Sequence, residues 1–358
     1  MFVIRQAMAD DAPTLLRLAR MVHFINLPAD KDIIASKVVK SRRSFSGELT
    51  DAHQRQFMFV LEDTDSGSVI GTSSLISQIS WPGWPQIYLQ VRRREHFSRD
   101  LNTGAVHMTI QVMTDESGPS ELGGLILAPG YRGHRERLGS LLSLVRFHFV
   151  GLHRSFFQDR IVAELMGPLT PDSRTLFWEF FGRRFINLSY AEADAFCQHS
   201  KEFMSSLLPK EEIHASILPP EARNLIGRVG EETRPAKAML EKQGFVYLDR
   251  CDPFDGGPYL EARRDDIPLV RSTEQLTLST SSSGDFPLTG FVSCAADARL
   301  GFRAVRSAYR REPDGTVALP AAVLVVLGAR PGVAIGVTPL GTGAAPAGAG
   351  AATAGAGA

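Results

Sequence analysis

The chain has 358 residues, of which 44% are hydrophobic and 22% charged, and its 39 basic and 39 acidic side chains give a formal net charge of +0. This composition is typical of a globular protein and excludes a largely disordered chain. The balanced charge argues against a generally basic nucleic-acid-binding protein. The three cysteines, Cys197, Cys251 and Cys294, are widely spaced and match no disulfide framework or zinc-ligand spacing, as is usual in a reducing compartment.

The N-terminal segment does not have the pattern of an export signal. Asp10 and Asp11 lie where a secretion signal needs an apolar stretch. No apolar run approaches the ~20 residues that a membrane span requires. We therefore expect a cytoplasmic protein without a membrane or nucleic-acid partner, and the length predicts two or three domains.

The first part of the chain predicts a strand, a helix and a hairpin. Residues 2–4 are a short apolar strand, and a helix is expected near Pro13, with acidic residues at its positive end. Residues 57–61 and 69–72 are two further strands joined by turn-forming residues. This order predicts an α/β chain of the α+β kind with a mixed sheet, rather than a repeating βαβ barrel.

The middle of the chain has the pattern strand, polar loop, helix. Residues 121–127 form a strand with two glycines, and residues 128–139 form a polar loop. The helix that follows has apolar side chains at helical spacing: Leu138, Leu141, Leu142, Val145 and Phe149. Farther along, the aromatic residues of 175–185 are expected in the core, and a short helix from Arg234 precedes a strand at 245–248.

The C-terminal part changes in composition. From residue 271, short β-rich runs are broken by Ser, Gly and Pro, which predicts a small antiparallel β module over 271–340. Residues 341–358 are almost entirely Gly, Ala, Pro and Thr, so we expect a disordered tail. The predicted domains are therefore a core over 1–270, the β module and the tail.

The loop between the strand at 121–127 and the following helix has the residues of an anion-binding site. It contains Arg132, Gly133, His134, Arg135, Arg137 and Gly139. A helix N-terminus offers free N–H groups, glycine lets a phosphate approach the backbone, and arginine pairs with phosphate oxygens. A diphosphate ligand such as coenzyme A fits this pattern. A solvated charged turn that only caps the helix has the same spacing, so both interpretations stay open.

Segments in and beyond this loop resemble a known family. The residues are 127–132, 139–142, Leu240-Glu241-Lys242-x-Gly244-Phe245 and Phe254-Asp255-Gly256-Gly257-Pro258. The loop is similar to the acyl-CoA-binding motif of the GNAT N-acyltransferases. More specifically, the chain resembles the arginine N-succinyltransferase family, which includes the arginine/ornithine succinyltransferase subunits, over most of residues 1–340.

The resemblance implies both a fold and an activity. The fold would be a GNAT-type mixed, mostly antiparallel sheet with flanking helices. The activity would be transfer of a succinyl group from succinyl-CoA to the α-amine of arginine or ornithine in arginine catabolism, without a metal. Leu125 on the central strand, together with Leu127, would contribute to succinyl-CoA binding. The partner subunits of the family imply a homodimer or a hetero-oligomer with a paralogous subunit.

The chain departs from the family pattern at two points. The family has a histidine proton donor in a Gly-x-Val-His string, whereas this chain has Gly230 at that position. Arg137 replaces a glycine of a phosphate loop that is two residues longer than in the family. Two further hypotheses therefore stay open: a non-catalytic subunit that binds acyl-CoA without turnover, and an acyltransferase for a different amine.

Several carboxylates are candidates for proton transfer and for binding the acceptor. Glu121 begins the central strand and is a candidate base, and Glu231 and Glu232 follow Gly230 and could replace the histidine. Glu164 and Asp255 are candidates for binding a basic amino acid, as is Glu261 by chain position. Each has a structural alternative: a salt-bridged strand end, acids at a helix start, or an Asp-Gly turn.

Overall fold

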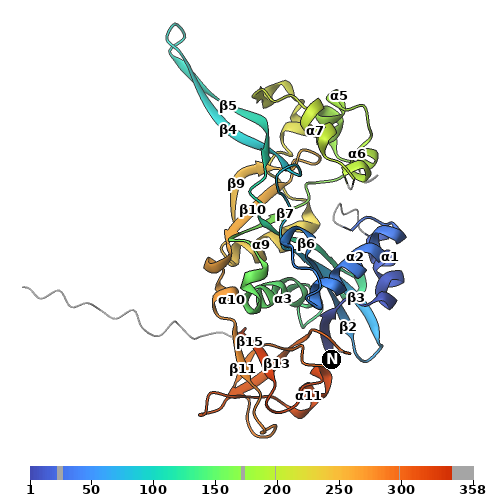
Figure 1. The fold of residues 1–358 in the computed structure, drawn as a ribbon. Coiled ribbons are helices and arrows are strands. Elements are labelled where there is room, and N and C mark those ends of the chain that lie inside the picture. The colour runs from blue at the N-terminus through green and yellow to red at the C-terminus, as the bar shows by residue number, and fades with distance from the viewer. Residues whose placement is uncertain (22–26, 171–173, 198, 298, 341–358) are drawn as a thin grey trace, which may run out of the picture.

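The computed structural model (Figure 1) describes residues 1–21, 27–170, 174–197, 199–297 and 299–340. The expected tail at 341–358 lies outside these residues. The strands are β1 (Phe2–Gln6), β2 (Gln56–Asp63), β3 (Ser68–Ile76), β4 (Gln86–Ser98), β5 (Thr103–Asp115), β6 (Ser120–Leu127), β7 (Arg160–Glu164), β8 (Ile213–His214), β9 (Val246–Cys251), β10 (Pro258–Arg263), β11 (Glu274–Thr277), β12 (Leu288–Cys294), β13 (Arg303–Arg311), β14 (Val317–Ala318) and β15 (Ala334–Pro339). The helices are α1 (Ala12–Arg20), α2 (Lys31–Phe45), α3 (Leu138–Leu152), α4 (Leu176–Phe180), α5 (Gly182–Phe185), α6 (Tyr190–Cys197), α7 (Glu202–Leu207), α8 (Pro220–Arg223), α9 (Arg234–Lys242), α10 (Pro268–Arg271) and α11 (Ala321–Leu327).

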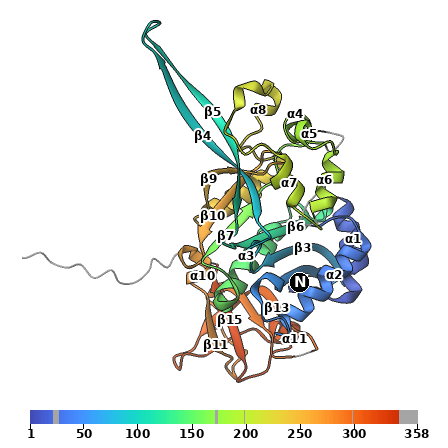
Figure 2. The same cartoon turned by 45° about the horizontal axis from the view of Figure 1, so that its top comes forward.

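Over the described residues, the strands form one 15-stranded sheet that runs the length of the molecule (Figure 1 and Figure 2). Its order is β11-β15-β12-β13-β1-β2-β3-β6-β7-β10-β9-β4-β5-β8, with β14 beside β13. The named strand pairs are antiparallel except for β6 with β7, which is parallel. The predicted mixed, mostly antiparallel sheet with flanking helices is confirmed.

Local patterns located most elements that position the site. The strands predicted at 2–4, 57–61, 69–72 and 121–127 correspond to β1, β2, β3 and β6. Helices α1, α3 and α9 begin where the helix signals predicted them. The apolar patterns are informative here because β2 is buried along most of its length and α1 buries Leu15, Leu18 and Ala19 on one side.

A long hairpin was not predicted. Strands β4 and β5 pair from Gln86↔Asp115 to Ser98↔Thr103 and project from the body of the protein (Figure 1). The outer half of this arm is exposed, and Phe97 near its tip is 66% exposed. Because the outer residues bury little, their sequence carries no apolar alternation that would indicate strands.

The C-terminal β-rich segment continues the main sheet. Strand β13 pairs with β1, with Ile4 opposite Ala304. His148 of α3 also links the two parts, because Nδ1 lies 2.6 Å from Oγ1 of Thr338 and Nε2 lies 2.7 Å from Oγ of Ser293. Burial, with a smaller effect of His153, lowers the pKa of His148 to about 3, so this link is made by a neutral ring. The boundary between 270 and 271 stays a prediction.

The aromatic segment at 175–185 lies in the core, as predicted. Phe177, Trp178 and Phe181 are buried, and Trp178 stacks on Phe254 with ring centroids 4.7 Å apart. Among the described residues, no helix combines the length and the apolar character needed to cross a membrane.

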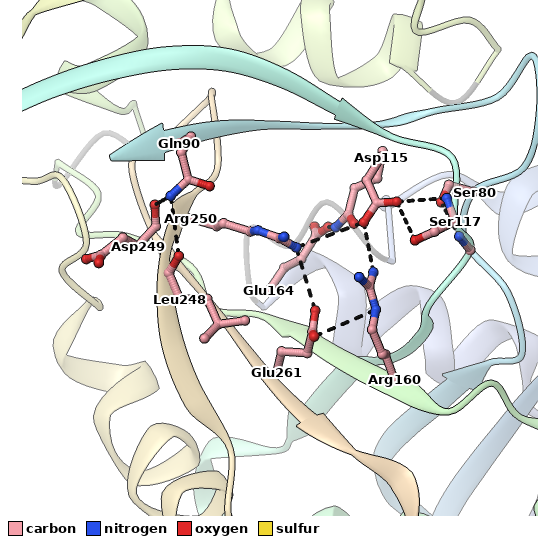
Figure 3. Close-up of polar contacts among 12 residues, drawn as sticks. Ser80, Gln90, Asp115, Ser117, Arg160, Glu164, Leu248, Asp249, Arg250 and Glu261 are labelled. Carbon is pink, nitrogen blue, oxygen red and sulfur yellow. Dashed lines mark hydrogen bonds and ion pairs between the residues drawn. The ribbon is translucent and has the colours of Figure 1, made fainter. Parts of the chain in front are cut away.

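Four charged side chains join the strands at the base of the arm (Figure 3). Arg160 of β7 contacts Asp115 of β5 at 2.8 Å and Glu261 of β10 at 3.7 Å. Arg250 of β9 contacts the same two carboxylates at 3.9 and 3.6 Å. Glu261, a candidate for substrate binding from its chain position, therefore belongs to an ion-pair cluster. Burial acts to raise the pKa of Asp115, but hydrogen bonds from Ser117 and Arg160 outweigh it and lower the pKa.

This cluster predicts a pH-dependent contribution to stability. A carboxylate whose pKa is lower in the folded state stabilises the fold above its unfolded pKa of ~3.9, and the contribution is lost as the pH falls through the folded value. We expect Asp115→Asn to lower the free energy of unfolding by about 1–2 kcal/mol at pH 7 and by much less at pH 3, measured by urea denaturation. The control is Asp100→Asn in the exposed turn of the arm. An equal loss at both pH values would contradict the prediction.

Candidate active site

The two parallel strands at the centre of the sheet separate soon after they begin. Over the described strands, β6 and β7 pair at Ser120↔Ile161 and Glu121↔Val162 and not beyond. The register of β6 against β3 also shifts in this region, at a bulge containing Gly124, whose φ of +57° favours glycine. Strands that part in this way expose backbone N–H and C=O groups, which a ligand can then bind.

A cavity of about 750 Å³ occupies the gap between the separating strands. Its walls are β6, the loop after β6, the first turns of α3, the end of β7 and α9. Every residue predicted to bind the cofactor lines it: Leu125, Leu127, Arg132, Gly133, His134, Arg135, Arg137 and Gly139. The structure thus brings the apolar strand and the cationic loop to one site.

The loop at the start of α3 is held by contacts on both sides. The ring of His134 packs edge-on against Phe2, with centroids 5.2 Å apart, and its Nδ1 accepts a hydrogen bond from the backbone N–H of Glu136 at 3.2 Å. Arg132 contacts Glu232, at the start of the α9 region, at 3.4 Å. These contacts place the arginines at the rim of the cavity, where exposed guanidinium groups can reach an anion.

A second cavity, of about 430 Å³, lies among α2, β3, β4, α6 and α7. Charged side chains of both signs line it: Lys37, Lys40, Glu121, Glu164, Asp194, Lys201 and Asp252. Glu164, at the end of β7, lines both cavities. Glu164 is therefore a residue that the two cavities share.

Glu164 is a buried carboxylate beside other acidic side chains. Nε2 of Gln86 donates a hydrogen bond to its Oε1 at 3.0 Å. Burial raises the pKa of Glu164 well above its usual range, and the nearby carboxylates of Glu121 and Asp252 raise it further. Such a shift is typical of a general base.

Two other side chains of the second cavity have environments that suit a ligand. Oδ1 of Asp194 is buried and has no hydrogen-bond partner among the described residues, and burial followed by the charge of Asp252 raises its pKa to about 6. Lys37 has a pKa lowered by burial, an effect that the charge of Glu121 opposes. The sequence analysis missed both residues because they come from α6 and α2, which no motif connects.

The remaining predicted residues have varied positions. Glu121 is buried in the second cavity, and Glu232 lies at the rim of the first. Glu231 is exposed and pairs with Arg234 at 3.3 Å. Asp255 lines neither of these two cavities; its carboxylate accepts hydrogen bonds from the backbone N–H groups of Gly167 at 2.9 Å and Gly257 at 2.7 Å. Their functional roles stay predictions.

Gly230 lies beside the segment that follows β7. Its backbone N–H donates to the carbonyl oxygen of Met166 at 3.0 Å, and a Cβ added to Gly230 would lie 3.1 Å from the carbonyl oxygen of Gly167. The position at which the resemblance expects a histidine is therefore next to the chain segment that continues from Glu164.

The separated strands, the cationic loop at a helix start and the cavity between them match the acyl-CoA-dependent acyltransferase that the sequence resemblance implies. Comparison with known proteins then gives the family. The family model described as Arginine N-succinyltransferase beta subunit matches residues 2–269. The chain belongs to the arginine N-succinyltransferase family.

Individual relatives agree with this assignment. The arginine N-succinyltransferases of Shigella dysenteriae serotype 1 and Escherichia coli O139:H28 are each 34% identical to the chain over 292 residues, which cover 80% of the chain and 84% of the relative. The solved structure of arginine/ornithine succinyltransferase subunit AI from Pseudomonas aeruginosa superposes with a TM-score of 0.78 at 26% identity, covering 96% of this chain and 99% of that one. The predicted family, fold and class of enzyme are confirmed.

The backbone of the loop predicts opposite effects of two similar substitutions. Arg137 has φ +52°, a left-handed conformation that costs a non-glycine residue ~1–2 kcal/mol. Arg137→Gly should therefore raise the free energy of unfolding by up to about 1 kcal/mol and weaken coenzyme A binding, because a cation is lost. The matched control Arg135→Gly removes a cation without relieving a positive φ and should lower stability. Urea denaturation and calorimetry measure the two effects, and a less stable Arg137→Gly than Arg135→Gly would refute the explanation.

Proposed function

We propose that the chain transfers the succinyl group of succinyl-CoA to the α-amine of arginine or ornithine. The observation that carries this proposal is that Glu164 lines both the cavity between β6 and β7 and the charged second cavity. A two-substrate acyl transfer needs one site for each substrate and a proton acceptor between them.

The first cavity suits an acyl-CoA. The arginines and backbone N–H groups at the start of α3 bind the diphosphate, which is the usual anion at a helix N-terminus. The pantetheine arm then follows the gap and uses the backbone groups that β6 and β7 leave unpaired. The thioester lies beside Leu125 and the Gly124 bulge, where backbone N–H groups polarise its carbonyl oxygen.

The second cavity suits a basic amino acid. The partnerless Oδ1 of Asp194 binds the guanidinium group, because a buried carboxylate oxygen without a donor is costly until a cation reaches it. Lys37 and Lys40 provide positive charge for the α-carboxylate. The α-amine then faces Glu164, at the junction with the first cavity.

The chemical step follows from this arrangement. Glu164 accepts a proton from the α-ammonium group, and the resulting amine attacks the thioester carbonyl carbon. The C–N bond forms and the C–S bond breaks. The second amine proton goes with the thiolate, so coenzyme A leaves as the free thiol. With Gly230 in place of the family's histidine, Glu164 carries the proton transfer alone.

We also propose a cytoplasmic enzyme that acts on small molecules, without a nucleic-acid or membrane partner, as a homodimer or with a paralogous subunit. The word subunit in the names of the matched family and the matched structure supports the oligomer. Within the described ranges, no group of three or more His, Cys, Asp or Glu side chains is placed to hold a metal ion. The proposed mechanism needs none.

The first test is the release of coenzyme A thiol from succinyl-CoA on addition of arginine, followed with a thiol reagent. We expect the turnover rate to fall as acid protonates Glu164. Glu164→Gln should lower kcat by ~10²–10⁴-fold and remove this pH dependence. Glu221→Gln, an exposed acid of α8 outside both cavities, is the control. If no basic amino acid releases thiol from the unchanged chain, the non-catalytic alternative holds and the proposal fails.

The second test concerns the acceptor. Asp194→Asn should raise KM for arginine by about 10–100-fold, because one charge-assisted hydrogen bond is lost, and should change kcat little. Glu192→Gln on the same helix is the control, since Glu192 accepts hydrogen bonds at the helix start and does not line the cavity. An unchanged KM in steady-state kinetics would exclude Asp194 from the acceptor site.

A further inference from the structure

A buried arginine lies in the wall of the cavity between β6 and β7. Arg146 of α3 is 3% exposed and lines this cavity. Its guanidinium group donates to the backbone oxygen of Ser143 at 3.0 Å, to Oγ of Ser143 at 2.9 Å and to the backbone oxygen of Gly123 at 3.4 Å. All three acceptors are uncharged.

No carboxylate balances this cation within the part of the chain that the structure describes. The polar contacts of Arg146 are the three bonds to Ser143 and Gly123, and none of the ion pairs involves it. Burial lowers its pKa to about 10, so the group still carries its charge at neutral pH. A buried charge without a partner is costly, and it is tolerated where a ligand brings the opposite charge.

The position of Arg146 separates it from the diphosphate site. Arg146 is eight residues beyond Leu138, where α3 begins, which is a rise of roughly 12 Å along the helix. Arg146 contacts the backbone oxygen of Gly123. Gly123 adjoins the Gly124 bulge in β6 and is two residues before Leu125. This is the part of the cavity that the acyl group occupies in the proposed function.

We propose that Arg146 binds the distal carboxylate of the acyl group and so selects a dicarboxylic acyl-CoA over a neutral one. The inference rests on the proposed function, which places the thioester beside Leu125. Ser143 orients the guanidinium group by two hydrogen bonds and leaves other N–H groups for the ligand. A four-carbon dicarboxylic acyl group carries an anion at its far end, and an arginine fork can bind it in bidentate fashion.

The test compares succinyl-CoA with butyryl-CoA, which has the same number of acyl carbons and no distal carboxylate. Binding is measured by calorimetry with the full chain, and kcat/KM is measured with arginine as acceptor. The unchanged chain should bind succinyl-CoA at least 10-fold more tightly than butyryl-CoA. Arg146→Met should weaken succinyl-CoA binding by about 10–100-fold and leave butyryl-CoA binding the same or tighter.

Arg132→Met is the matched control because Arg132 lies in the loop at the start of α3. This variant should weaken the binding of succinyl-CoA and butyryl-CoA equally, since both ligands carry the same diphosphate. If Arg146→Met weakened the binding of both thioesters equally, Arg146 would only support β6, and the inference would be overturned. Equal affinity of the unchanged chain for the two thioesters would also overturn it, whether or not the variant folds. If the unchanged chain bound succinyl-CoA in preference to butyryl-CoA but showed no turnover, the proposed function would be refuted and this inference would stand.

Discussion

The separation of β6 from β7 is the constraint on which the site depends. Two parallel strands that paired along their whole length would close the gap and satisfy their own backbone groups. Here pairing stops after Glu121↔Val162, and the bulge at Gly124 moves the backbone of β6 out of register with β3. The lost strand pairing costs backbone hydrogen bonds. This cost is offset by packing on the side of the sheet that α3 covers, where Leu142 and Val145 are fully buried. The open backbone and the cavity have the same structural origin.

The location of Glu164 follows from this geometry. It lies on β7 two residues beyond the last pair, where the strand has left its neighbour. Glu164 therefore lines both cavities, while burial and neighbouring acids raise the pKa of its carboxyl group, which makes the carboxylate a stronger base. Because Glu121 lines only the second cavity of the two, the geometry favours Glu164 over Glu121 as the group between the substrates.

The strand–loop–helix unit could be predicted from the sequence alone, whereas the acceptor site could not. The arginines and glycines of the loop are consecutive, so their clustering is visible without a fold. Asp194, Lys37 and Asp252 meet only after α6, α2 and the β9–β10 connection fold against each other, and no local spacing reports this. Arg146 was hidden for another reason: it interrupts an apolar helix, where one charged residue among buried ones gives no motif.

The C-terminal strands are part of the main sheet, because β13 pairs with β1. Strand β1 has β2 on one side and β13 on the other, so it is an interior strand. A protein ending before β11 would leave β1 as an edge strand with a row of unsatisfied backbone donors and acceptors, a surface that invites pairing with other chains. Strand β13 therefore covers an edge of the sheet that would otherwise lie open beside β1.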